Sequence, residues 1–305
     1  MKTADVLRIA SAHLEGLSGH VFDLLTVSKP ISADAAVNLS KTVSKLSPLL
    51  GNLIEFNTVE FLNDKKEFKG LGVWKRQDPG FPDTIFAGPI TPTAGFEIKA
   101  WFPLATEITA RFKDSQNHFT EDQTSVCMIA WLPDQLIFGK PYIIDVCIVP
   151  GGSVAKARDD HYHNPPDYLV LEPENTKSRT VNLQQTNTNG FKFQGTPAQF
   201  EEAKQIVAGW GKNSTGYQPT AEYQLLVRQL IARFPYRLDT NFAKMDRIVH
   251  PGIEAFKKRV LATKIHGLTI AQWSALLYRG SDGEVRAALQ KRFGIIEEDA
   301  DKLLR

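Results

Sequence analysis

Cysteine is scarce in this chain. Only Cys127 and Cys147 occur among the 305 residues, and both stand within apolar stretches. Free cysteine in such surroundings behaves as a small core residue, and the pair provides neither a disulfide framework nor a metal site. We therefore expect both thiols to be buried and reduced.

Long apolar runs are also missing. No stretch reaches the roughly 20 apolar residues that a membrane-spanning helix needs. The polar residues Asp5, Arg8, His13 and Glu15 interrupt the N-terminal segment, so it lacks the apolar core of a signal peptide. These absences predict a cytoplasmic protein with no membrane partner.

Charge of one sign is not in excess either. Lys and Arg number 36, Asp and Glu number 34, and the formal net charge is +2. A nucleic-acid partner would therefore need a local basic surface on this protein. Hydrophobic residues make up 42% and charged residues 23%, which is typical of one large globular domain or two modest ones.

Two common enzyme signatures are absent as well. The chain has no Gly-x-Ser-x-Gly elbow and no dinucleotide fingerprint. The run 209–214 fails as a phosphate-binding loop, because Ile206 replaces its first glycine and Asn213 follows its lysine.

Two acids and a lysine form the main functional candidate. Pro82-Asp83 is followed, after a turn rich in Gly, Pro and Thr, by Glu97-Ile98-Lys99. The segment 95–101 alternates apolar and polar residues as a strand does, which puts Glu97 and Lys99 on one face. A hairpin would bring Asp83 beside Glu97.

Such a constellation suits magnesium chemistry. Mg²⁺ takes few protein oxygens and keeps several waters, so Asp83 and Glu97 are candidate metal ligands. Lys99 could hold or deprotonate a water that attacks phosphorus, while the metal offsets the growing charge. The alternative is an ordinary ion pair on the surface of a strand.

The surrounding pattern favours the catalytic interpretation. A helix is predicted over 49–62, then the hairpin, an amphipathic helix over 104–113, and strands around 126–131 and 142–149. With Pro82-Asp83 and Glu97-Ile98-Lys99, this order resembles the core of the PD-(D/E)xK nuclease superfamily, and within it the type II restriction endonucleases. The resemblance covers roughly residues 45–150.

The resemblance implies a fold and a catalytic set. It implies an α/β protein with a central mixed sheet flanked by helices, in which Asp83 and Glu97 bind Mg²⁺ and Lys99 orients or activates water. A glutamate on the preceding helix often helps to place metal-bound water in this superfamily, and Glu55 is the candidate. A solvated glutamate on the polar face of the helix is the alternative.

Candidate DNA contacts lie on both sides of this motif. Lys75 and Arg76 precede the acid, and Arg111 either faces phosphate or pairs with Glu107 at i,i+4. The long polar stretch 151–195 is predicted to hold recognition loops, because Arg, Lys, Asn and Gln can bond base edges. A polar surface hairpin is the alternative. The candidate DNA contacts within 151–195 are Lys156, Arg158, Arg179, Gln184, Gln185 and Asn187.

The C-terminal part is predicted to be helical. Helices are expected over 253–261, 269–277 and 282–293, which divides the chain into a nuclease domain, 1–240, and a helical subdomain, 241–305. The apolar stripes of these helices indicate core or a dimer surface, with a helix-turn-helix reader of DNA as the alternative.

The function predicted from the sequence is that of a Mg²⁺-dependent, sequence-specific endonuclease acting on double-stranded DNA. A palindromic target suits a homodimer in which each subunit cuts one strand. The alternatives are a repair-type or modification-dependent nuclease with the same site, and a non-catalytic nucleic-acid-binding protein.

Overall fold

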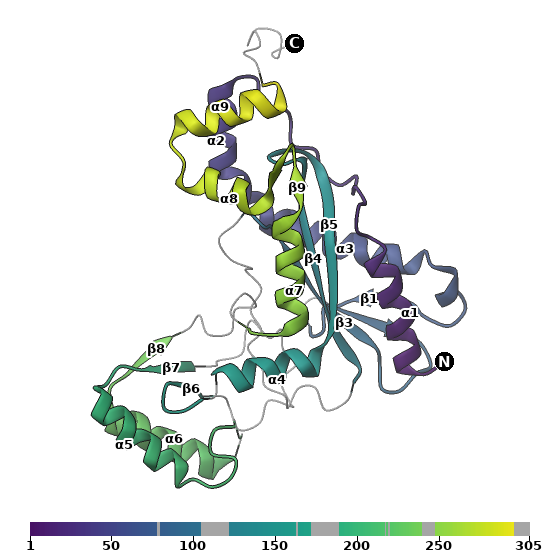
Figure 1. Cartoon of the computed structure of the whole chain (residues 1–305). Helices are drawn as coiled ribbons and strands as arrows, with labels where there is room; N and C mark the ends of the chain where they lie inside the picture. The colour runs from purple at the N-terminus through teal and green to yellow at the C-terminus, as the bar shows by residue number, and fades with distance from the viewer. Residues whose placement is uncertain are drawn as a thin grey trace.

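A mixed five-stranded sheet organises the structure. The computed structural model describes residues 1–77, 80–104, 122–162, 164–171, 189–216, 218, 220–239 and 248–295. The strand order is β1-β2-β3-β4-β5; β3 and β4 are parallel and the other neighbours antiparallel (Figure 1). The strands are β1 (Val73–Arg76), β2 (Thr84–Ala87), β3 (Gly95–Trp101), β4 (Thr124–Gln135) and β5 (Phe138–Pro150).

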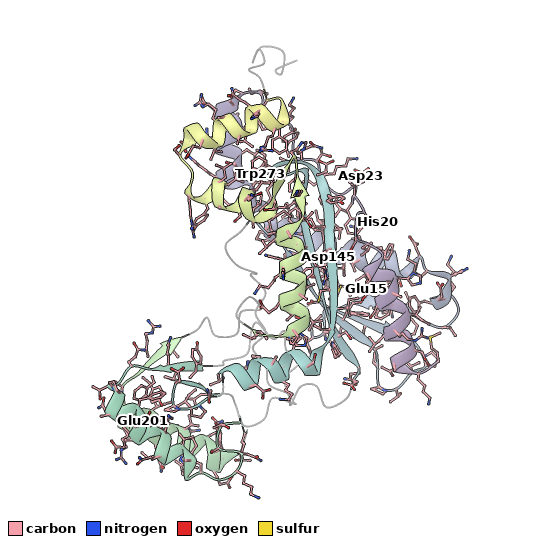
Figure 2. The ribbon with its side chains drawn as sticks, in the orientation of Figure 1. Glu15, His20, Asp23, Asp145, Glu201 and Trp273 are labelled. Atoms are coloured by element: carbon pink, nitrogen blue, oxygen red, sulfur yellow. The ribbon has the colours of Figure 1, made fainter. Side chains whose placement is uncertain are left out.

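Helices cover both faces of this sheet. On one face lie α1 (Thr3–Glu15), which packs on β5, and α3 (Ser47–Asn63), which packs on β1 and β3. On the other lie α4 (Gly151–Tyr162) and α7 (Pro251–Ala262). Arg259 of α7 pairs with Asp145 of β5 at 2.8 Å, and Asp145 lies beside this helix (Figure 2).

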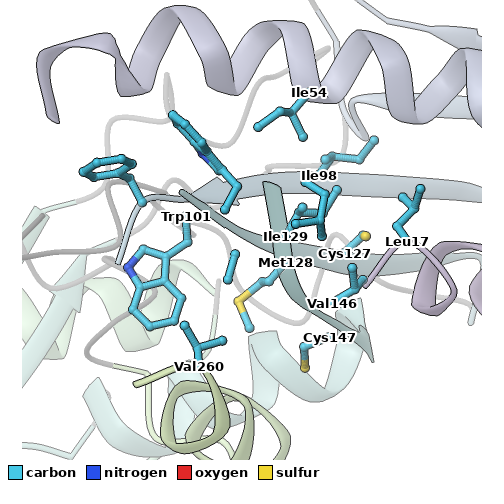
Figure 3. Packing of buried hydrophobic residues seen from close by; sticks show 14 of the residues in the cluster. Leu17, Ile54, Ile98, Trp101, Cys127, Met128, Ile129, Val146, Cys147 and Val260 are labelled. Carbon is cyan, nitrogen blue, oxygen red and sulfur yellow. The ribbon is translucent and has the colours of Figure 1, made fainter. Parts of the chain in front are cut away.

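Strand alternation sorts the core into two layers. Ile98 and Cys127 lie on the side of α3, near Ile54, whereas Trp101 and Met128 lie on the side of α7 (Figure 3). β4 is buried from Thr124 to Pro133, as expected of a central strand with both faces covered. Both cysteines are buried and free, which confirms that part of the prediction.

A second apolar cluster lies apart from this core. The antiparallel sheet β6-β7-β8 packs with α5 (Pro197–Ala208) and α6 (Ala221–Arg233), at the lower left of Figure 1. Its strands are β6 (Tyr168–Leu171), β7 (Asn189–Phe193) and β8 (Tyr236–Asp239). Its buried residues, such as Phe193, Val207 and Leu230, do not belong to the main cluster. We call residues 168–239 the small module.

The predicted C-terminal helices are confirmed: α7, α8 (Ile270–Arg279) and α9 (Asp282–Phe293), with a short hairpin of β9 (Lys264–Ile265) and β10 (Leu268–Thr269) between α7 and α8. They contribute to the main core. α9 packs on α2 (Ala33–Thr42), which belongs to the N-terminal part of the sequence. Residues 248–295 thus share one apolar core with the N-terminal part of the chain. The domain boundary predicted at 240/241 would instead assign these two parts to separate units.

One local prediction was wrong. The start of the expected recognition loops, 151–162, is the helix α4, because Val154, Ala155 and Arg158 form a buried stripe against the sheet. Gly151 and Gly152 occupy its first positions, so they do not interrupt its interior. Val21 and Val27, between α1 and α2, form isolated bridges to Tyr142 and Gly139 of β5.

Short 3₁₀ turns stand at both ends of α3, and no described helix is suited to span a membrane. Two 3₁₀ turns, η1 (Val43–Leu46) and η2 (Lys66–Phe68), flank α3. Among the residues that the structure describes, no helix combines the length and apolar character needed to cross a bilayer.

The outer edge of β1 is closed by a side chain. Asn63, the last residue of α3, accepts from the Trp74 amide at 2.8 Å and donates to the Trp74 carbonyl at 3.0 Å. It therefore replaces a neighbouring strand at one position of an edge that would otherwise expose unpaired peptide groups.

We predict that Asn63→Ala lowers the free energy of unfolding by about 1–3 kcal/mol, because two partly buried peptide groups lose their partner. Urea titration measures the loss. Asn52→Ala, at an exposed position of the same helix, is the matched control. Equal stability of the two variants would show that the edge contact contributes little.

Candidate functional site

The structure brings Asp83, Glu97 and Lys99 together. The Lys99 ammonium lies 2.5 Å from Glu97 Oε1 and 3.1 Å from Asp83 Oδ2. Backbone amides complete the cluster: Ile98 N donates to Asp83 Oδ2 at 2.7 Å, and Asp83 N donates to Glu97 Oε2 at 3.3 Å. The hairpin thus gives the adjacency that the sequence pattern suggested.

Pairing of β2 with β3 produces this adjacency. Thr84 and Phe96 are register partners, so Asp83, just before β2, lies next to Glu97 on β3. Gly95 makes the approach possible, because a Cβ there would stand 2.4 Å from Pro82 Cγ and 2.8 Å from the Thr84 carbonyl oxygen. The Pro82 ring occupies the space of the missing side chain. Sequence reasoning missed this role, although a glycine two residues before the glutamate was the available signal.

The cluster is largely removed from water. The exposed fraction is 2% for the Glu97 side chain, 8% for Lys99 and 20% for Asp83, so Asp83 is its most accessible member. Burial raises the pKa of Glu97 to about 7, against the opposing charge of Lys99. Burial by itself would lower the pKa of Lys99, but the adjacent carboxylates of Glu97 and Asp83 outweigh it and raise that pKa. Lys99 is therefore a hydrogen-bond donor in this structure.

Glu55 joins the cluster from α3. Burial raises the pKa of its carboxyl, and the nearby charge of Asp83 raises it further. Arg76 of β1 donates to Glu55 Oε1 at 2.8 Å, and its side chain remains 33% exposed. The sequence analysis assigned Arg76 to DNA and did not foresee this pairing, because α3 and β1 meet only in the tertiary structure.

The other described DNA candidates have different surroundings. Lys75 is exposed on β1. Lys156 is exposed on α4 and pairs with Asp160 one turn later. Arg158 is fully buried in the same helix, so it does not belong to an exposed DNA-contacting surface. This corrects the expectation that 151–162 is an open loop.

Several candidates lie outside the described residues. The expected helix 104–113 falls there except for Leu104, and with it Arg111. The same is true of the loop candidates Arg179, Gln184, Gln185 and Asn187.

The carboxylates of the site bear on whether it can hold a metal ion. No group of three or more His, Cys, Asp or Glu side chains gathers at a metal-binding distance within the described ranges. Asp83 and Glu97 form a pair of carboxylates, which fits Mg²⁺, because that ion takes few protein oxygens. When both carboxyls are ionised, the cluster of Asp83, Glu97 and Lys99 has one ammonium against two carboxylates; a cation would balance this negative excess and would favour the ionised form of Glu97, whose pKa burial raises to about 7.

Ser153 and His250 form a second pair, which resembles the nucleophile and base of a serine hydrolase. Their Oγ and Nε2 atoms are 3.1 Å apart, beside a surface pocket between α4 and α7. His250 Nδ1 accepts from Gly252 N at 3.1 Å, so in the neutral ring Nε2 carries the hydrogen. Ser153 donates to the Pro150 carbonyl, so His250 does not act as its base. The pair is a structural link that caps α7.

Comparison with protein-family models, with curated proteins and with solved structures finds no match for this chain.

We predict that Gly95→Ala destabilises the protein by about 1–3 kcal/mol, because the new methyl group collides with Pro82 and the backbone of β2. Thermal and urea unfolding measure the change. Gly283→Ala, where a Cβ meets nothing within 4 Å, is the matched control and should not destabilise. An undiminished midpoint in Gly95→Ala would contradict the close approach.

We also predict a pH effect at His250. Burial lowers its pKa below the ordinary 6.5, so the unfolded chain binds the proton more readily. The stabilisation is therefore complete above about pH 6.5 and is lost as the pH falls through the lowered pKa of the folded state. Urea unfolding at about pH 7.5 and about pH 5.5 measures it.

His250→Asn keeps a capping acceptor without a group that titrates in this range, so its stability should change less between the two pH values. His20→Asn, at an exposed position, is the control. The same acid loss in His250→Asn as in the unmodified chain would remove His250 as its source.

Proposed function

We propose that this protein is a Mg²⁺-dependent endonuclease that hydrolyses phosphodiester bonds of double-stranded DNA. The observation that carries the proposal is the cluster of Asp83, Glu97 and Lys99 at the β2–β3 hairpin. It joins two carboxylates and an ammonium at the end of the sheet where β2 begins. The mixed sheet with helices on both faces is compatible with the resemblance to PD-(D/E)xK nucleases.

Charge balance supports a functional role over a purely structural one. Burying ionised groups is costly, and apolar residues of similar size often stabilise a protein equally well. A cluster kept for stability would be expected to balance its charges, but Asp83, Glu97 and Lys99 carry a negative excess whenever Glu97, whose pKa burial raises to about 7, is ionised. Glu55 and Arg76, which pair with each other, do not remove it. A bound cation would.

Each residue then has a definable task. Asp83 and Glu97 would hold Mg²⁺, which when bound supplies charge to offset that on the phosphate and the leaving oxygen. Lys99 would orient the attacking water by donating to it, because the two carboxylates hold it in the charged form. Glu55 carries a raised pKa close to Asp83 and would accept a hydrogen bond from, or share a proton with, that water.

The finer assignment follows the resemblance. We propose a type II restriction enzyme that reads a specific sequence, acts as a homodimer on a twofold site and works in the cytoplasm. Repair-type and modification-dependent nucleases share the same catalytic set and differ in the DNA they choose. Cleavage of methylated and unmethylated plasmids separates these alternatives.

We predict that Asp83→Ala and Lys99→Ala each lower DNA cleavage by at least about a hundredfold while DNA binding persists. The first removes a metal ligand and the second removes the group that orients water. Plasmid cleavage with Mg²⁺ and anisotropy binding without it measure the two properties, and EDTA should abolish cutting.

Asp23→Ala and Lys140→Ala are matched controls, because these residues form an exposed Asp–Lys pair on another surface (Figure 2 labels Asp23). Both should cut DNA normally. Full activity in Asp83→Ala or Lys99→Ala would refute the site. DNA binding that is indifferent to Mg²⁺, with no cleavage by the unmodified protein, would favour a non-catalytic binding protein.

A further inference from the structure

Helices α5 and α6 pack on one face of the β6-β7-β8 sheet; on the opposite face Val170 of β6 belongs to the main core, whereas Lys192 of β7 and Arg237 of β8 are exposed. Phe193 of β7 contacts Phe200 of α5 at 5.4 Å between ring centres, and it also contacts Phe234 and Tyr236. Alternation therefore turns the odd positions Phe191 and Phe193 toward the helices and the even positions to the opposite face. In Figure 1, α5 and α6 lie on one side of this sheet.

The exposed part of the face opposite α5 and α6, on β7 and β8, presents polar donors. Lys192 and Gln194 of the β7 segment are exposed, and so is Arg237 of β8. The register pairs Lys192 with Arg237 on one side and with Tyr168 of β6 on the other. Two cations and an aromatic ring thus lie in one row across the three strands.

Direct opposition of two cations is unfavourable in itself. Side chains directly opposite each other on antiparallel strands have Cβ atoms about 4.5–5.5 Å apart, and like charges there destabilise the sheet. Neither Lys192 nor Arg237 makes an ion pair or a side-chain hydrogen bond within the part of the chain that the structure describes. The next acid along β8, Asp239, has Gly190 as its register partner, two residues along each strand from the pair of Lys192 and Arg237.

An anionic partner would relieve this repulsion. A phosphate that bridges Lys192 and Arg237 would receive two charge-assisted hydrogen bonds. The Gln194 amide, two residues from Lys192, donates one N–H to the Phe193 carbonyl at 2.7 Å and has a second N–H for the phosphate. Repeated phosphates are the feature of duplex DNA that supplies such a partner without base recognition.

We propose that the row of Lys192, Gln194 and Arg237 binds the phosphate backbone of duplex DNA and anchors the small module on it. This inference rests on the proposed function. It assigns a sequence-independent role to the module: its cations position the DNA, and they do not read its bases. It also supplies the local basic surface that a chain with a net charge of only +2 requires.

The test is the salt dependence of DNA binding. Lys192→Ala/Arg237→Ala and unmodified protein are titrated onto a fluorescent duplex of about 30 base pairs, without divalent cation, from about 50 to about 200 mM salt. Each phosphate contact contributes about 0.9 to the steepness of log K against log salt, so the loss of two contacts should make the slope shallower by about 1.8. Binding of the variant should also be weaker at every salt concentration. Circular dichroism and thermal unfolding verify that the variant is folded.

The matched control removes two cations from elsewhere in the small module. Lys212 follows α5 and Arg228 lies on α6; both are exposed and neither belongs to the proposed face. Lys212→Ala/Arg228→Ala changes net charge equally and should retain the original slope. Equal effects of the two double variants, or no effect of Lys192→Ala/Arg237→Ala, would overturn the proposal.

The outcomes separate this proposal from the function on which it rests. If the unmodified protein binds and cuts DNA but the Lys192/Arg237 variant keeps the full salt slope, this face fails and the nuclease assignment stands. If the unmodified protein neither binds nor cuts DNA, both fail together. The same titration with an RNA duplex completes the test, because a larger loss on RNA than on DNA would overturn the choice of DNA.

Discussion

Lys99 joins the carboxylates of Asp83 and Glu97 where β2 begins beside the central strand β3, and this contact is the constraint on which the proposed site depends. Glu97 is almost wholly buried, so its charge needs an ammonium within hydrogen-bond reach, and Lys99 supplies it at 2.5 Å. Asp83 shares the same ammonium and also accepts from Ile98 N. The arrangement exists only while β2 and β3 keep their register, because a slip of one residue would turn Glu97 and Lys99 to the other face.

The surrounding elements protect that register. Gly95 leaves room for Pro82, and the pairing of Thr84 with Phe96 positions Asp83. From the other side, β4 runs parallel to β3 along its whole length and is buried on both faces. α3 completes the site by bringing Glu55 near Asp83, where Arg76 holds it. These strands and α3 thus surround the site. Asp83 is its most exposed member and is therefore the one that a substrate would reach.

In the function that we propose, the chemistry of the site and the attraction of DNA belong to different parts of the molecule. Its net charge is small, so a general electrostatic attraction cannot carry binding. The main core contains the acid cluster, while the small module has a core of its own and presents Lys192 and Arg237 on a face that its helices leave open. Such a division would let a phosphate-binding surface add affinity without adding further cations beside the proposed metal ligands, Asp83 and Glu97.

The sequence by itself determined the local elements and the candidate triad. Alternation over 95–101, the cap at Ser32 and the helical stripes of 253–293 depend on neighbouring residues, so they could be predicted. Tertiary structure alone decided that 151–162 is a helix, that Arg158 is buried, that Arg76 pairs with Glu55, and that α7–α9 join the N-terminal core. These outcomes depend on contacts between residues far apart in the chain, and the free energy of such contacts is not encoded in any single segment.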